Sequence, residues 1–198
     1  HTRWASVGAI SEPNCHPVDN KAGGSSEGGI YHVCLNGDID NYLALKERME
    51  KAGQVIPSEV STDTKVIPLL VEHHVREGAD VAEAFRRAVN EFEGSHAIAM
   101  HTDLAPGRMF LAQRGSGQAI FVGLADSHYM AASEVYGFIE ETDTYLKLDG
   151  ERSAEGRDGE ETRGQIVILD QESEGGLSGI TSTHYDGTPV TLTDSDRK

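Results

Sequence analysis

The run Ile30-Tyr31-His32-Val33-Cys34-Leu35, followed directly by Asn36-Gly37, decides how this chain folds. Its β-branched and aromatic side chains are typical of a buried strand, which the Asn-Gly dipeptide ends. A strand end holds its groups rigidly, and glycine lets another molecule approach the backbone closely. We therefore expect Asn36 and Gly37 to place hydrogen-bond donors at a site, although most Asn-Gly pairs only make turns.

A glycine-rich polar stretch lies before this strand. Residues 21–29 include Gly23-Gly24-Ser25-Ser26-Glu27-Gly28-Gly29, which is too polar and too rich in glycine to hold regular structure. The stretch predicts a flexible loop.

Helices are predicted after the strand, where apolar residues recur at helical spacing. They cover residues 42–49, which Gly53 can end, residues 66–74, and residues 81–92, which stop at Gly94. Asp80 and Glu83 match a capping box for the third helix. Asp63 lies just before the second helix, where the macrodipole favours the ionised carboxylate.

The pattern becomes strand-like after Gly94, with short apolar runs between turn residues. Strands are predicted at residues 96–101, 108–113, 119–124, 128–132, 144–148 and 165–169, with a short helix at 134–140 and an acidic loop at 149–161. The first four strands suggest an antiparallel meander. Helices ahead of consecutive strands indicate an α+β fold rather than alternating βαβ units.

Polar residues near three of these segments suggest a binding site for an amino acid. A substrate whose side-chain amide is cleaved needs a cation for its carboxylate, an anion for its ammonium group and donors for the developing oxyanion. Arg3, Asp63 and Asn36 with Gly37 offer these groups in turn. Each has a simpler interpretation, since Arg3 alone reads as a surface residue and Asp63 as a helix cap.

The motifs, taken in order, resemble those of the class II glutamine amidotransferases, and most closely the glutaminase half of glucosamine-6-phosphate synthase. They are T-R-W-A at 2–5, N-x-H-P at 14–17, N-G at 36–37 and T-D-T at 62–64, with weaker similarity at 115–116 and 132–135. The resemblance implies a four-layer αββα sandwich of the N-terminal nucleophile hydrolase type over residues 1–198. It also implies an oxyanion hole at Asn36 and Gly37, glutamine binding by Arg3, Trp4 and Asp63, and no cofactor.

The family's nucleophile is a cysteine at the N-terminus of the mature domain, ahead of T-R-W-A. This chain begins at His1, and neither Cys15 nor Cys34 holds that position. We therefore expect a glutaminase domain without its first segment, which binds glutamine but does not hydrolyse it. In the intact protein, which we expect to be a homo-oligomer, ammonia would pass to fructose 6-phosphate on an isomerase domain that this sequence lacks.

The alternative is a degenerate domain that only binds glutamine or serves as an assembly surface. Val7 and Leu35 stand where the family usually has histidines, and Lys65 stands where it has a glutamate. These departures and the missing cysteine favour the alternative. A cysteine directly after an initiator methionine upstream of His1 would favour the enzyme.

Composition excludes several other classes. The 17 basic and 33 acidic side chains give a net charge of -16, which disfavours nucleic acids and anionic membranes. No apolar stretch approaches the roughly 20 residues that span a bilayer, so we expect a cytoplasmic protein. The cysteines and histidines at 15, 16, 32 and 34 fit no standard zinc spacing, and no metal is expected.

Overall fold

The computed structural model describes residues 1–21, 28–153 and 163–198. Residues 22–27 of the loop predicted at 21–29 and residues 154–161 of the loop predicted at 149–161 lie outside the described residues. At the base of the first loop, Asn20 Oδ1 accepts the backbone N–H groups of Ile30 and Tyr31 at 2.9 and 3.2 Å.

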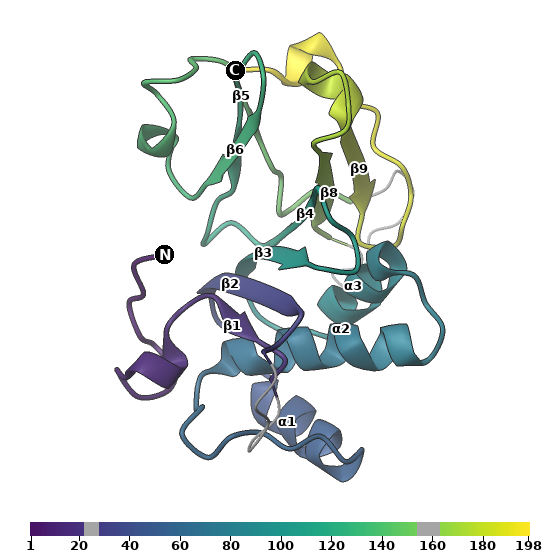
Figure 1. The fold of residues 1–198 in the computed structure, drawn as a ribbon. Coiled ribbons are helices and arrows are strands. Elements are labelled where there is room, and N and C mark those ends of the chain that lie inside the picture. Colours follow the sequence, from purple (N-terminus) through teal and green to yellow (C-terminus); the bar gives the residue numbers. More distant parts are fainter. Residues whose placement is uncertain (22–27, 154–162) are drawn as a thin grey trace.

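Two antiparallel sheets form the centre of the fold (Figure 1). The larger sheet has the order β1-β2-β3-β4-β8-β9, and the smaller has the order β6-β5-β7. The larger sheet comprises β1 (Val18–Asp19), β2 (Tyr31–Gly37), β3 (His96–Thr102), β4 (Arg108–Arg114), β8 (Gln165–Asp170) and β9 (Ile180–His184). The smaller comprises β5 (Phe121–Leu124), β6 (Tyr129–Ala132) and β7 (Tyr145–Lys147).

Helices α1 (Tyr42–Lys51), α2 (Val66–Arg76) and α3 (Val81–Asn90) form close to their predicted positions. Asp80 caps α3 by accepting the N–H of Glu83 at 2.9 Å. The Glu83 carboxylate binds Arg86 and Arg87 on its own helix, so the predicted capping box is only half formed.

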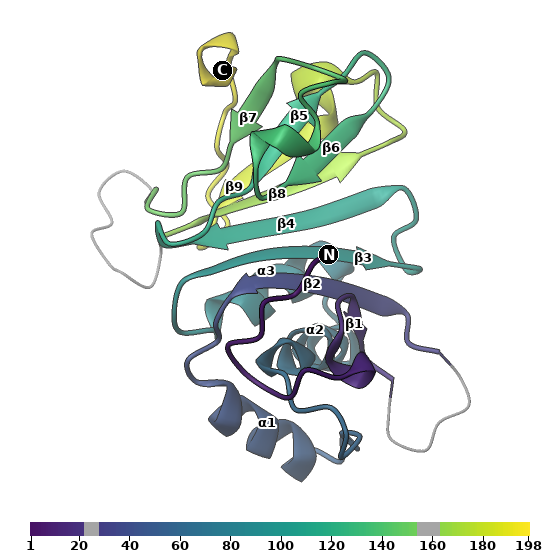
Figure 2. The same ribbon diagram turned by 90° about the vertical axis from the view of Figure 1, so that its left-hand side faces the viewer.

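The large sheet buries both of its faces because strand residues alternate between them. Val33, Ile98 and Phe110 belong to one core cluster with residues of all three helices. Leu111 and Val167 point the other way and pack with Val122 and Leu146 of the small sheet. Helices and the small sheet therefore lie on opposite sides of the large sheet (Figure 2).

The predicted α+β class is confirmed, with helices, large sheet and small sheet stacked as successive layers. A segment around the buried Phe138 covers the outside of the small sheet, where it packs against Gly123. This segment holds only the 3-10 turn η3 (Val135–Gly137), so the helix predicted at 134–140 is wrong. Glycine within the turn disfavours a longer helix.

The predicted meander is also wrong, because β3 and β4 pair in the large sheet whereas β5 and β6 pair in the small one. After β4 the chain crosses between sheets, and β4 pairs with the distant β8 instead. Strand β9 was not predicted, since Ile180 is the single apolar residue of its I-T-S-T-H sequence.

Candidate functional site

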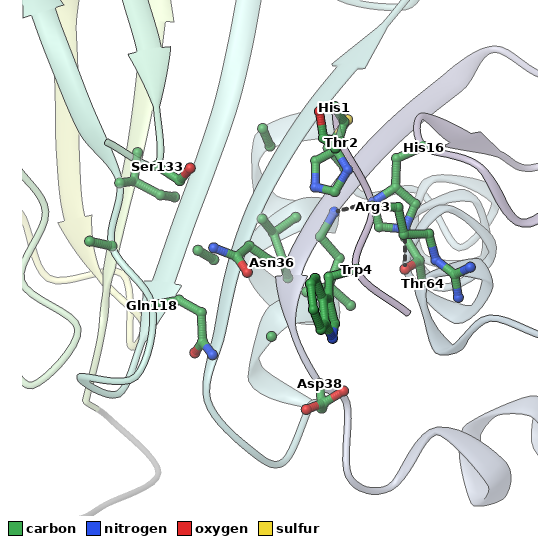
Figure 3. A pocket seen from close by; sticks show the side chains of 18 of the residues that line it. His1, Thr2, Arg3, Trp4, His16, Asn36, Asp38, Thr64, Gln118 and Ser133 are labelled. Carbon is green, nitrogen blue, oxygen red and sulfur yellow. Dashed lines mark hydrogen bonds between the residues drawn. The ribbon is translucent and has the colours of Figure 1, made fainter. Parts of the chain in front are cut away.

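A cleft of about 820 Å³ opens where the small sheet stops covering the large one. Its lining comes from the end of β2, the N-terminal loop, the T-D-T turn, the segment after β4 and the end of β6, together with residues of β3 and β4. All five predicted site residues, Arg3, Trp4, Asn36, Gly37 and Asp63, line this cleft. Figure 3 shows the side chains of most lining residues around the open space.

Asn36 and Gly37 sit at the end of β2, as the sequence predicts. Asn36 is exposed, and no described residue forms a hydrogen bond with its side-chain amide. Gly37 has φ +107, and a Cβ there would lie 2.3 Å from the carbonyl oxygen of Ser95. Only glycine fits this conformation and this close contact. Their role as an oxyanion hole stays a prediction.

Asp63 starts the 3-10 turn η2 (Asp63–Lys65) and is only 4% exposed. Its two carboxylate oxygens accept the N–H groups of Ile39 and Thr64, both at 2.9 Å. Burial raises the pKa of Asp63, and nearby Asp38 adds to the rise, while the backbone N–H groups oppose it. Asp63 therefore ties the turn after β2 to η2, and its role in binding an ammonium group stays a prediction.

Arg3 and Trp4 lie at the mouth of the cleft. The Arg3 guanidinium donates to the carbonyl oxygens of Ala9, at 3.1 Å, and Val7, which braces its own loop. Figure 3 shows this group directed away from Asn36. Trp4 is 96% exposed. Because a guanidinium has five N–H donors, Arg3 can keep these bonds and still hold a carboxylate.

The N-x-H-P motif acts as a clamp on the T-D-T segment. Asn14 is fully buried, and its Oδ1 accepts the backbone N–H groups of Ser61 and Thr62 at 2.7 and 3.0 Å. Its amide nitrogen lies within hydrogen-bonding distance of three oxygens, those of Ser11 Oγ, Glu59 O and Ser61 Oγ. The motif therefore positions Asp63 by holding the two residues that precede it, Ser61 and Thr62.

His16 completes the clamp. Its Nδ1 accepts the N–H of Leu35 at 3.4 Å, so Nε2 carries the proton and donates to Thr64 Oγ1 at 3.0 Å. Burial lowers the pKa of His16 to about 4, with further lowering by Arg3 and the N-terminal amino group. The ring is neutral near pH 7. It accepts the backbone N–H of Leu35 on β2, beyond Val33, where the pairing with the first residue of β1 lies.

Lys65 supports the site without lining the cleft. This buried side chain donates through Nζ to the carbonyl oxygens of Asp19 and Lys21 at 2.6 and 2.8 Å. Burial lowers its pKa, while Asp19 opposes the shift. The departure from glutamate at this position therefore has a structural role, which is to hold the end of β1 against η2.

Two site residues were missed by the sequence analysis. Asp38 follows Gly37, lines the cleft and accepts a hydrogen bond from Ser6, which fastens the N-terminal loop to the end of β2. Gln118 lines the opposite wall. Asp38 could have been found as the polar residue next to Asn36-Gly37, whereas Gln118 carries no local signal. No group of three or more metal-ligating side chains occurs among the described residues.

The comparisons with known proteins agree with the order of the motifs. Residues 19–140 match the model of a family described as the glutamine amidotransferase domain. The chain belongs to this family. None of the helices within the described ranges is long and apolar enough to cross a bilayer.

Relatives of this amidotransferase domain include enzymes named glutamine–fructose-6-phosphate aminotransferase (isomerizing). The one from Methanothermobacter thermautotrophicus is 35% identical over 170 residues, covering 86% of this chain and 25% of the relative. The one from Sulfolobus acidocaldarius is 32% identical over 201 residues, covering 100% of this chain and 28% of the relative. The amidotransferase domain thus spans about a quarter of the length of these relatives.

The fold of the amidotransferase domain also matches solved structures. A glutamine phosphoribosylpyrophosphate amidotransferase from B. subtilis aligns with a TM-score of 0.66 at 20% identity, covering 93% of this chain and 34% of that one. This similarity confirms the expected fold, in agreement with the family resemblance of the motifs.

Proposed function

We propose that this chain is the glutaminase part of a glutamine-dependent aminotransferase. In the whole protein, a cysteine thiolate would attack the side-chain amide of glutamine, form a glutamyl thioester and release ammonia. Ammonia would then pass to fructose 6-phosphate on a separate domain, giving glucosamine 6-phosphate. The relatives' names support this acceptor, and a cytoplasmic homo-oligomer remains our expectation for the whole protein.

One observation carries the proposal: the end of β2 presents Asn36 and Gly37 to the same cleft that Arg3, Trp4 and Asp63 line. These groups come from three distant segments of the chain. The buried Asn14 and the half-buried His16 hold two of those segments together. Donors fixed in this way need no rearrangement when negative charge develops on a substrate oxygen.

The first test measures L-glutamine binding to this chain by isothermal titration calorimetry. Arg3→Ala is the test variant, and Arg76→Ala is the control because Arg76 is exposed on α2 and pairs only with Glu72 among the described residues. We expect binding by the wild type and the control, and at least tenfold weaker binding by Arg3→Ala. Equal affinity of all three would refute the assignment of Arg3.

The catalytic part is tested on a longer form of the protein that carries an N-terminal cysteine ahead of T-R-W-A. Asn36→Ala should lower the kcat of ammonia release by about 10²–10³, as expected for loss of one oxyanion-hole donor. Because Asn36 is exposed and its side chain bonds to no described residue, this variant should fold normally. Unchanged kcat would refute the oxyanion role.

The non-catalytic alternative is also supported by one observation. Leu35 stands where the family usually has a histidine; it lines the cleft next to Asn36 and is 4% exposed, so this position offers no proton-transfer group. A longer protein that binds glutamine but releases no ammonia would establish this alternative.

A further inference from the structure

Gln118 lies against the glycine that the proposed function assigns to the oxyanion hole. Were a Cβ present on Gly37, it would lie 3.0 and 3.1 Å from Cδ and Oε1 of Gln118. The two residues are 81 positions apart in the sequence numbering and meet because the segment after β4 forms the wall facing the end of β2. Figure 3 shows the amides of Gln118 and Asn36 on the same side of Trp4.

Ser95 orients the Gln118 amide. Its hydroxyl lies 2.8 Å from Gln118 Oε1 and 3.2 Å from the carbonyl oxygen of Arg114. A serine hydroxyl has one proton, and the shorter contact receives it. The same residue accepts the N–H of Asp38 on its backbone oxygen at 3.3 Å. Ser95 therefore fixes Gln118 relative to the segment that carries Asn36 and Gly37.

This orientation leaves the Gln118 amide nitrogen as a donor at the cleft. Oε1 is occupied by Ser95, and no acceptor among the described residues bonds to Nε2. Gln118 is only partly exposed, and it lines the cleft. An amide N–H₂ held in this way can donate to an oxygen of a bound ligand next to Gly37.

We propose that Gln118 contacts the substrate, by donating through Nε2 to the side-chain oxygen of the bound amino acid, with Ser95 as its positioning residue. This inference rests on the proposed function, because it takes glutamine as the ligand. A neutral amide at this place can donate either to the amide oxygen of glutamine or to a carboxylate oxygen of glutamate. A carboxylate there would discriminate strongly between the two.

The test uses Gln118→Glu and Gln118→Met in the full chain. The Gln118→Glu variant keeps an oxygen acceptor for Ser95 but loses the N–H₂ donor. The Gln118→Met variant keeps the length of the side chain and loses both the acceptor and the donor. Calorimetry measures the affinities for L-glutamine and L-glutamate, and thermal unfolding checks the fold. Ser95→Ala is measured in parallel as a test of positioning.

We expect both Gln118 variants to bind glutamine about five- to tenfold more weakly, as the loss of one hydrogen bond predicts. Gln118→Glu should weaken glutamate binding by at least about a further fivefold, because two carboxylates would meet in the cleft. Ser95→Ala should weaken glutamine binding by about two- to fivefold. A purely structural role would lower the melting temperature and change both affinities by the same factor.

Three results would overturn the inference in distinguishable ways. Wild-type protein that binds neither amino acid would count against the proposed function itself. Wild-type binding with unchanged affinities in both Gln118 variants would count against Gln118 alone. An unchanged ratio of glutamine to glutamate affinity in Gln118→Glu would assign Gln118 to structure rather than to contact with the substrate.

Discussion

Replacing Asn14 by alanine tests whether the N-x-H-P motif supports the site by clamping the T-D-T segment. The side-chain oxygen Oδ1 of Asn14 accepts two consecutive backbone N–H groups, those of Ser61 and Thr62, and the side chain is fully buried. Alanine would leave both donors unpaired. The Thr62 N–H is buried, so leaving it unpaired costs about 1–3 kcal/mol, whereas the Ser61 N–H is only part-buried and costs less. A water in the vacated space can recover part of either cost. We expect the free energy of unfolding to fall by about 2–3 kcal/mol.

Asn20→Ala is a matched control for this variant. Asn20 Oδ1 also accepts two consecutive backbone N–H groups, of Ile30 and Tyr31, but the side chain is only half-buried and lies at the opposite end of β2. Because water can reach these donors, its loss should cost about 1 kcal/mol. Urea unfolding followed by circular dichroism at pH 7.5 measures the free energy of unfolding of both variants. An Asn14→Ala variant as stable as Asn20→Ala would refute the clamp.

Further predictions concern the strand end, the half-buried His16 and the buried Lys65. Gly37→Ala should lower the free energy of unfolding by at least about 2 kcal/mol, because φ is +107 and a Cβ would overlap the carbonyl oxygen of Ser95. Gly53 has φ +89 and open space around it, so Gly53→Ala should lower it only by the backbone strain, about 1–2 kcal/mol. Chemical denaturation of both variants separates overlap from strain, and equal losses would exclude the overlap. The folded pKa of His16 is lowered from 6.5 to about 4, so its contribution to stability is present above pH 6.5 and is lost as the pH falls towards 4. His16→Asn should therefore lose less stability than the wild type between pH 7.5 and pH 5, and parallel pH profiles would contradict the lowered pKa of His16. Lys65→Met should lower stability by about 1–3 kcal/mol by leaving the carbonyl oxygens of Asp19 and Lys21 without their donor, yet leave glutamine affinity within twofold. A large loss of affinity would place Lys65 in the site itself.

Local patterns were sufficient to predict the main elements of the fold. β2 and the three helices follow from apolar periodicity, and the strands that pair most extensively follow from short apolar runs. Pairing between sheets could not be predicted in the same way, because β4 is equally apolar on both faces and its partner β8 lies 51 residues beyond its end in the sequence numbering. Strand β9 pairs with β8 at the edge of the large sheet, a contact that its own sequence does not signal.

The site was likewise predictable from local motifs only in part. The ordered motifs predicted that Arg3, Asn36 and Asp63 share one site, and all three line one cleft. The sequence could not show that the Arg3 guanidinium bonds to its own loop or that both Asp63 oxygens accept backbone N–H groups, because these contacts depend on the path of the chain between motifs. The contact of Gln118 with Gly37 is likewise set by tertiary packing alone.

The most direct test of the central claim is a titration of the ¹⁵N-labelled chain with L-glutamine, followed by NMR. We expect saturable shifts of the Gly37 backbone N–H and the Asn36 side-chain amide signals, with the Gly53 signal unchanged as an internal reference. Shifts confined to residues outside the cleft, or no saturable shift at Asn36 and Gly37, would contradict the account.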